Sequence, residues 1–304
     1  MTVVDTVISI FLLLFVGYGT KKLRLLRAED ADLLNNVVVY LTLPAFIFEA
    51  IYSYRQPLPL SIAKVPIIGF AMILIVLAVA YLVGKALKLD KPTLSGLMLA
   101  AAFGNTGFLG YPVIKTAFTQ KAALVTAVLY DEVAMALPLF TLGVAIAAGF
   151  AGERVDRKQL LRVFLLPSML AIPVALILRP LSLPQPLMTS IRYLAEGTIP
   201  LVMISLGLSL SARSLKGYAV PVLAACVLKM ALLPLLTFYS LRAGGVSGVM
   251  LQAGVVESGM PSAVMTCVIA AKFGANAKFV AAAIFVSTLL SIAAIPTVLV
   301  LLRV

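Results

Sequence analysis

One run of nine residues carries the polar groups best placed to bind a ligand inside a long apolar segment. Residues 104–112 read Gly-Asn-Thr-Gly-Phe-Leu-Gly-Tyr-Pro. Glycine costs about 1 kcal/mol relative to alanine in a helix interior, and proline costs about 3 kcal/mol. Where a helix is interrupted in hydrocarbon, its freed backbone groups must face protein or a watery cavity. The run therefore predicts a helix break at which Asn105, Thr106 and the backbone meet a polar ligand.

A second interrupted run lies in the other half of the chain. Gly259-Met260-Pro261, followed by Ser262, matches Gly110-Tyr111-Pro112. The glycines, including Gly104 and Gly107, could instead serve only to let helices pack closely, as small residues do in membranes. Two breaks at corresponding places favour a binding site, because paired Gly/Pro-interrupted spans mark the substrate site of many transporters.

Three ionisable residues lie about halfway along apolar segments: Asp131, Lys229 and Glu257. A charge at mid-depth in a bilayer is costly unless it is paired or hydrated, so each residue is a functional candidate. Carboxylates are the natural proton carriers here, because burial disfavours their charged form. The alternative is a structural ion pair between Lys229 and either acid. Ser205 is a marginal candidate, because serines in membranes usually bond back to their own helix.

The residue types exclude several chemistries. The chain has no histidine, so Ser-His, Cys-His and zinc-hydrolase sites have no raw material. Its two cysteines, Cys226 and Cys267, lie within apolar segments and are expected to be buried rather than bonded to each other. An aspartyl intramembrane protease would need two facing aspartates, and Asp131 is the only one inside a span. The phosphate-binding pattern Gly-x-x-x-x-Gly-Lys-Ser/Thr is absent. We therefore expect no catalytic residue, metal site or cofactor.

The elements that hold these residues are membrane spans. Of 304 residues, 62% are hydrophobic and 12% are charged, which excludes an ordinary soluble domain. A helix needs roughly 20 apolar residues to cross the bilayer. The pattern predicts ten helices, at residues 3–19, 33–52, 66–84, 93–114, 122–148, 163–178, 188–210, 218–241, 246–271 and 279–302.

The net charge of +12 lies in short clusters between these spans and not on a continuous basic face, which argues against nucleic-acid binding. Loops on one side hold 15 Lys and Arg residues and those on the other hold 8. By the positive-inside rule, the first side is cytoplasmic and both termini lie outside, on the periplasmic side of a bacterial inner membrane.

The two halves, 1–151 and 152–304, are related by their proline contexts. Pro44 lies in Leu-Thr-Leu-Pro, and Pro200 lies in Gly-Thr-Ile-Pro at the corresponding place. Because five spans are an odd number, the first half ends on the side of the membrane opposite to its start. The second half therefore begins on that opposite side and has the inverted orientation. We therefore expect two inverted five-helix repeats.

These runs together resemble the auxin efflux carrier family. The resemblance rests on residues 105–112, on 200–210 ending in Ser-Leu-Gly-Leu-Ser-Leu, and on 259–264, with Leu228-Lys229 and Asp131 in support. It implies ten helices whose fourth and ninth members, broken at Pro112 and Pro261, cross as in sodium/proton antiporters and bile-acid symporters. It also implies an elevator-like motion of a transport domain against a scaffold, and a homodimer.

The resemblance further implies that Asn105 helps to bind a substrate carboxylate beside this crossing. The chain lacks the long central loop of the plant carriers and looks more like short bacterial members, some associated with malonate or other carboxylates. Glu257 is not among the residues that carry the resemblance. Its predicted role in proton coupling therefore rests only on the cost of a charge within a membrane span.

The leading hypothesis is a secondary transporter of small organic anions, auxin-like acids or dicarboxylates, that works by alternating access and couples to protons. The alternative is a sodium-coupled symporter of the bile-acid type, with Glu257 as an ion ligand. A channel or a receptor is a further alternative. The expected partners are the anion, the lipid bilayer and a second copy of the chain.

Overall fold

The computed structural model describes residues 3–153, 155–210 and 217–304. Within these ranges all regular structure is helical, apart from one isolated bridge between Gly104 and Ser262. The expected all-helical architecture is confirmed. Arg154, Arg213 and Lys216, which contribute to the predicted charge asymmetry, lie outside the described residues.

The first half of the chain forms α1 to α8. Their bounds are Val3–Lys22 (α1), Asp30–Val37 (α2), Leu43–Tyr52 (α3), Leu60–Ala86 (α4), Lys91–Ala102 (α5), Tyr111–Ala117 (α6), Lys121–Leu129 (α7) and Val144–Ala151 (α8). Wide π-helical turns continue several of these helices. They are Val38–Thr42 (η1), Thr106–Gly110 (η2), Tyr130–Ala136 (η3) and Leu139–Gly143 (η4).

The second half forms α9 to α16. Their bounds are Arg157–Leu161 (α9), Pro167–Leu178 (α10), Gln185–Ser209 (α11), Ala219–Val227 (α12), Leu233–Ala243 (α13), Gly248–Ser258 (α14), Val264–Lys272 (α15) and Ala277–Leu301 (α16). A short 3-10 turn, Arg162–Leu165 (η5), precedes α10, and a π turn, Leu228–Leu232 (η6), joins α12 to α13.

Within the described part of the chain, six continuous helical stretches are long and apolar enough to cross a membrane. They are Asp30–Tyr52, Leu60–Ala86, Lys121–Ala151, Gln185–Ser209, Ala219–Ala243 and Ala277–Leu301. Many large apolar side chains on these stretches are exposed, among them Ile67, Leu82 and Leu235. A multi-pass membrane protein has this distribution, because lipid rather than protein covers its outer surface.

The π turns follow a rule that involves proline. Four of them end two residues before a proline, namely Pro44, Pro112, Pro138 and Pro234. Proline lacks an N–H and clashes with the preceding turn of a regular helix. A wider turn relieves this clash without ending the helix, and such π segments are often found at functional sites. Here they also hold Asp131 and Lys229.

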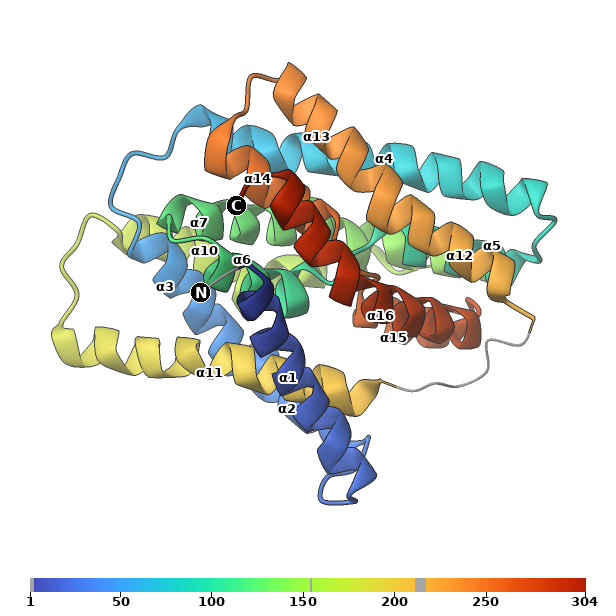
Figure 1. The fold of residues 1–304 in the computed structure, drawn as a ribbon, viewed down its shortest axis with the longest axis horizontal. Coiled ribbons are helices and arrows are strands. Elements are labelled where there is room, and N and C mark those ends of the chain that lie inside the picture. Colours follow the sequence, from blue (N-terminus) through green and yellow to red (C-terminus); the bar gives the residue numbers. More distant parts are fainter. Residues whose placement is uncertain (1–2, 154, 211–216) are drawn as a thin grey trace.

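Two large hydrophobic cores, beside one small cluster around Tyr54, divide the described helices into two groups. The first core is built mainly from α1, α3, α10 and α11, which lie at the left and in the lower part of Figure 1. The second is built mainly from α4, α5, α8, α12, α13, α15 and α16, which lie above and to the right. The segment 106–129 and helix α14 contribute to the contact between the two groups, because both hold side chains buried in the first core beside helices of the second.

Helices α1 and α11 cross at unusually short range. A Cβ atom on Gly17 would overlap the backbone carbonyl of Ile204, and one on Gly207 would overlap the carbonyl of Leu14. Lys21 then donates hydrogen bonds to the carbonyl oxygens of Leu208, at 2.6 Å, and of Leu210. Glycine at both crossing points lets the backbones touch, as in other membrane helix pairs.

Gly207→Ala should therefore destabilise the protein, by about 1–3 kcal/mol for overpacking against fixed backbone. Gly149→Ala is the matched control, since a Cβ there meets nothing within 4 Å. We expect the thermal unfolding midpoint in detergent to fall for Gly207→Ala and to stay or rise for Gly149→Ala. Equal midpoints for the two variants would contradict the close crossing.

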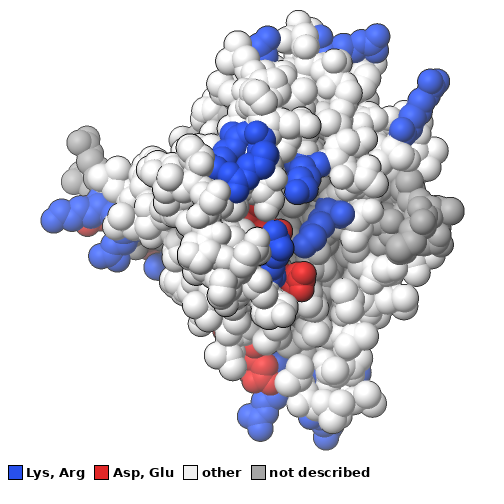
Figure 2. All heavy atoms as spheres, turned by 90° about the vertical axis from the view of Figure 1, so that its left-hand side faces the viewer, with Lys and Arg blue, Asp and Glu red and all other residues white. Residues whose placement is uncertain are grey.

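The ends of α3 and α10 meet on the face drawn in Figure 2. The Tyr52 hydroxyl donates to the Leu181 carbonyl at 2.8 Å and accepts from the Leu183 N–H at 3.0 Å. Arg55 and Arg179 exchange hydrogen bonds with the opposite loop. Figure 2 shows that basic side chains gather near the middle of this face, beside smaller acidic patches. Basic residues thus occur on the predicted outer side too. The predicted orientation therefore depends on the larger number of Lys and Arg residues on the predicted cytoplasmic side.

Candidate functional site

The two interrupted segments lie against each other, backbone to backbone. Helix α5 ends at Ala102, and the Ala263 N–H donates to the Phe103 carbonyl at 3.0 Å. The Asn105 N–H donates to the Pro261 carbonyl at 2.7 Å. Each extended segment therefore supplies hydrogen-bond partners that the other would lack in an apolar interior.

The break in the first run does not lie where we expected it. Pro112 was predicted at the break, but it lies inside α6, and the interruption is at residues 103–105. The wide turn η2 lets the helix run on through Pro112. In the second run, Pro261 does lie at the interruption, between α14 and α15.

Each glycine of the first run lies against one buried charge. A Cβ on Gly104 would lie 2.7 Å from Cε of Lys229, and one on Gly107 would lie 2.9 Å from Oδ2 of Asp131. A Cβ on Gly110 would overlap the carboxylate of Glu257. The glycines at intervals of three therefore admit three charged side chains from three other helical segments.

Asp131 is held by donors from the first run. The Tyr111 hydroxyl donates to Oδ2 at 2.8 Å, the Thr106 hydroxyl donates to Oδ1, and the Gly107 backbone N–H also donates to this carboxylate. The Asp131 side chain is 8% exposed. It therefore ties the turn that follows the break to η3.

Lys229 and Glu257 are both fully buried on the other side of the run. Lys229 Nζ donates to the carbonyl of Ser258, the last residue of α14, at 2.5 Å. Neither carboxylate oxygen of Glu257 has a hydrogen-bond partner among the described residues. The two charges attract each other. In the described part of the chain, Lys229 is nevertheless not in direct ion-pair contact with Glu257 or with Asp131.

A cavity of about 550 Å³ lies between the two helix groups, next to the first break. Of the predicted site residues, Asn105, Thr106, Gly107 and Asp131 line it. The Asn105 amide nitrogen is buried and has no hydrogen-bond partner among the described residues. The other predicted residues are not among those that line it: Gly110, Tyr111, Pro112, Ser205, Lys229, Glu257, Gly259, Met260, Pro261 and Ser262.

The cavity also has polar lining residues that were not predicted from the sequence. They are Asp32, Asn35, Asn36, Glu132 and Ser168. The adjacent pair Asn35-Asn36 at the start of an apolar run and Glu132 beside Asp131 were available signals. Ser168 carries no such signal, but its hydroxyl donates to Glu132 at 3.2 Å. Ser205 contributes indirectly, since its hydroxyl donates to Oδ1 of Asn35 at 2.6 Å.

The charge of the lining limits what the cavity can bind. Asp32, Asp131 and Glu132 line it, whereas its described lining includes no lysine or arginine. The Asn105 amide, which has no partner among the described residues, can donate to a carboxylate, whereas the single proton of the Thr106 hydroxyl is already donated to Asp131. An anion bound there also needs the neighbouring acids to be neutralised by protons or by a cation.

Comparison with known proteins gives one consistent result. A family model described as "Membrane transport protein" matches residues 2–300. Proteins of Methanocaldococcus jannaschii and Methanothermobacter thermautotrophicus, each named "Uncharacterized transporter", are 32% identical over 299 and 301 residues, with 96% of each chain covered. A "Putative malonate transporter" of Rhizobium meliloti is 28% identical over 317 residues, covering 98% of this chain and 95% of the relative. The names describe transporters and not enzymes.

Proposed function

The chain belongs to the membrane transport protein family, and on that premise we propose that it moves small organic anions across the bilayer by secondary active transport. The observation that carries this proposal is the cavity beside the first break, which Asn105 lines and where its buried amide nitrogen has no hydrogen-bond partner among the described residues. A buried donor without a partner is costly in a folded protein, and a ligand carboxylate would satisfy it.

We propose small carboxylates as the substrate class, dicarboxylates first. The Rhizobium relative named for malonate supports this choice, as does a cavity whose lining combines apolar side chains with the amide of Asn105. A volume of about 550 Å³ also admits larger carboxylates such as auxin-like acids.

Protons are the proposed coupling ions. An anion can share the cavity with Asp131 and Glu132 once these carboxylates are protonated. Glu257 has no hydrogen-bond partner within the described residues, and its neutral form is the one an apolar site favours. Uptake driven by an acid-outside gradient would follow from protons that enter with the anion.

The proposed architecture has ten spans in two inverted repeats, 1–151 and 152–304, whose interrupted helices cross at residues 103–105 and 259–263. The antiparallel bridge between Gly104 and Ser262 supports the crossing. The separate cores support an elevator motion, in which the group around α5, α12 and α16 moves against the group around α1, α3 and α11. We further propose a homodimer in a bacterial inner membrane, with both termini outside.

Sodium coupling is the second candidate, because three carboxylates line the cavity. Sodium-coupled transporters often bind the ion at carbonyl ends of broken helices. Here the Lys229 ammonium contacts such an end, the Ser258 carbonyl of α14. Because the ammonium occupies the place at which a sodium ion would bind, we favour protons over sodium as the coupling ions. Uptake that stops when choline replaces sodium would reverse this preference.

The test of the substrate site is Asn105→Ala in proteoliposomes. Loss of one hydrogen bond to a charged ligand costs about 1.5–3 kcal/mol, so we expect KM for malonate, succinate or indole-3-acetate to rise roughly 10- to 100-fold. Asn36→Ala is the matched control, because this exposed amide lines the same cavity but is already hydrated. Absence of saturable uptake of all three acids by the wild type would overturn the proposed function.

A further inference from the structure

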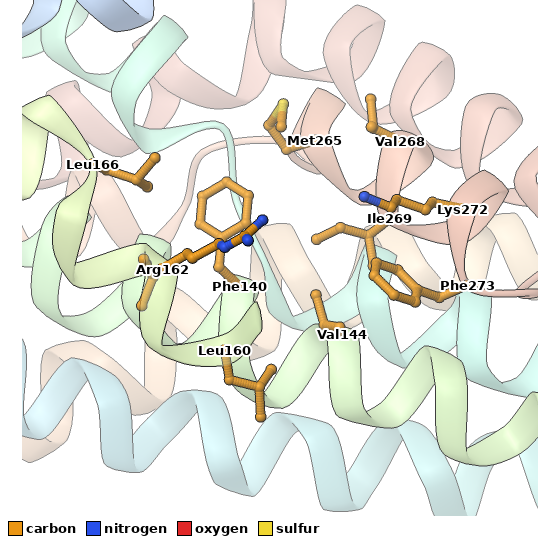
Figure 3. A pocket seen from close by; sticks show the side chains of 11 residues that line it. Phe140, Val144, Leu160, Arg162, Leu166, Met265, Val268, Ile269, Lys272 and Phe273 are labelled. Carbon is orange, nitrogen blue, oxygen red and sulfur yellow. The ribbon is translucent and has the colours of Figure 1, made fainter. Parts of the chain in front are cut away.

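A second pocket, of about 280 Å³, lies beside the cavity. It is formed by η4 and α8, by the segment 160–166 and by α15 (Figure 3). The two helix groups meet here, since α10 packs on α3 whereas α8 and α15 pack on α5. The pocket therefore lies along the boundary that an alternating-access motion would open and close.

Among the described residues, the charged side chains that line this pocket are two cations, Arg162 and Lys272. Figure 3 shows their nitrogen atoms reaching toward each other from opposite walls, Arg162 from η5 and Lys272 from the end of α15. Within the described residues the Arg162 guanidinium has no hydrogen bond or ion pair, and the Lys272 ammonium has none besides its place over the Phe273 ring, 5.6 Å from the centroid. Two like charges that face each other without an acid are stabilised by a shared anion.

The remaining walls of the pocket are apolar. Val144, Ile269 and Phe273 line the pocket next to the two cations (Figure 3). A carboxylate would thus find positive charge at the rim and hydrocarbon or aromatic contact below it. This is the chemistry of a small organic anion, and a fully hydrated inorganic ion would leave the apolar walls unused.

The pocket continues into the central cavity. Phe140, Leu166, Met265 and Val268 line both spaces. Among the residues that the structure describes, the central cavity is lined by acids and no base, whereas the pocket is lined by two bases and no acid. The positive charge that would attract an anion lies outside the cavity, next to it.

We propose that the Arg162–Lys272 pocket is a loading site that captures the organic anion at the mouth of the central cavity. This inference rests on the proposed function for the identity of the anion. The two cations raise the local concentration of anion by electrostatic attraction, and the shared apolar residues lead it to Asn105. The pocket opens on the side that we predict to be cytoplasmic, so it would load substrate for export or receive it after uptake.

The test measures binding and transport separately. Binding of labelled malonate is measured on protein in phosphatidylcholine nanodiscs, and uptake in proteoliposomes, for the double variant Arg162→Gln/Lys272→Gln. The matched control is Lys158→Gln/Lys278→Gln, which removes the same charge from exposed positions that do not line the pocket. We expect the double variant to bind malonate at least about tenfold more weakly than the control, with KM raised and kcat little changed.

The outcomes separate this inference from the proposed function. Uptake with equal KM in the double variant and the control would overturn the loading site and leave the transport function standing. Binding that the double variant loses, in a protein that transports none of the acids, would support the anion site and overturn the transport function. If phosphatidylglycerol in the nanodiscs displaces malonate from the wild type, a lipid headgroup occupies the pocket and the inference fails.

Discussion

Replacing Lys229 with methionine is expected to abolish uptake and to lower the thermal unfolding midpoint more than any other single change described here. The Lys229 side chain is fully buried, donates to the Ser258 carbonyl and attracts the Glu257 charge. Removing the ammonium leaves the buried Ser258 carbonyl without this donor and takes away the positive charge that attracts Glu257, and each buried polar group left uncompensated costs about 1–3 kcal/mol. The measurement is thermal unfolding in detergent together with uptake in proteoliposomes.

A double variant distinguishes loss of charge balance from loss of packing. Lys229→Met/Glu257→Gln removes both charges and should recover most of the lost stability, because neutral partners avoid the desolvation cost. It should not recover uptake if Glu257 carries the coupled proton. The control is Lys64→Met, since Lys64 also donates to a carbonyl at a helix end, that of Gly244 at 2.9 Å, but is exposed. A double variant as unstable as Lys229→Met alone would show that the two charges do not interact.

The second large effect is expected for Asp131→Asn. The carboxylate accepts hydrogen bonds from Tyr111, Thr106 and the Gly107 N–H. Asparagine offers one acceptor oxygen and a donor in place of the second oxygen, so at least one of these donors loses its partner. With about 1.5–3 kcal/mol for each hydrogen bond to a charged group, we expect uptake to fall roughly 100-fold.

Variants that remove one hydrogen-bond donor to Asp131 at a time show how much each donor contributes to the loss of uptake. Thr106→Val and Tyr111→Phe should each lower uptake less than Asp131→Asn does. Thr126→Val is their control, because Thr126 is equally buried but donates only to the Ala122 carbonyl of its own helix, at 2.7 Å. Wild-type uptake by Asp131→Asn would show that the carboxylate neither positions the turn nor takes part in coupling.

The helices were largely predictable because a bilayer imposes a simple rule. An apolar stretch such as 122–148 has to be helical in lipid, and the helical stretch Lys121–Ala151 coincides with it. Asp131, Lys229 and Glu257 could also be selected in advance, since a charge within such a stretch is costly and therefore rare.

The place of the break could not be read from residue types. Proline is the strongest local breaker on propensity scales, so Pro112 was the natural choice. The structure keeps Pro112 inside α6 by widening the preceding turn, and it breaks the chain at Phe103–Asn105, where backbone partners arrive from residues 261–263. Those partners lie more than 150 residues away in the sequence, so only the tertiary structure shows them.

The cavity lining was only partly predictable for the same reason. Asn105 and Thr106 stand out within one span, whereas Glu132 and Ser168 become neighbours only after the spans pack. The basic pair Arg162 and Lys272 was counted with the loops, and only packing brings the two residues to one pocket.

The contacts of the three glycines with Lys229, Asp131 and Glu257 have a consequence for how this stretch can change over generations. Each charged side chain occupies the space that the absence of a glycine side chain leaves open. A methyl group gained at Gly110 therefore leaves no room for the carboxylate of Glu257. Such a substitution is tolerated only together with a shorter or uncharged residue at 257. The two positions of such a pair, although far apart in the chain, have to change together. Relatives that differ at one of the three glycines should therefore also differ at the charge it faces.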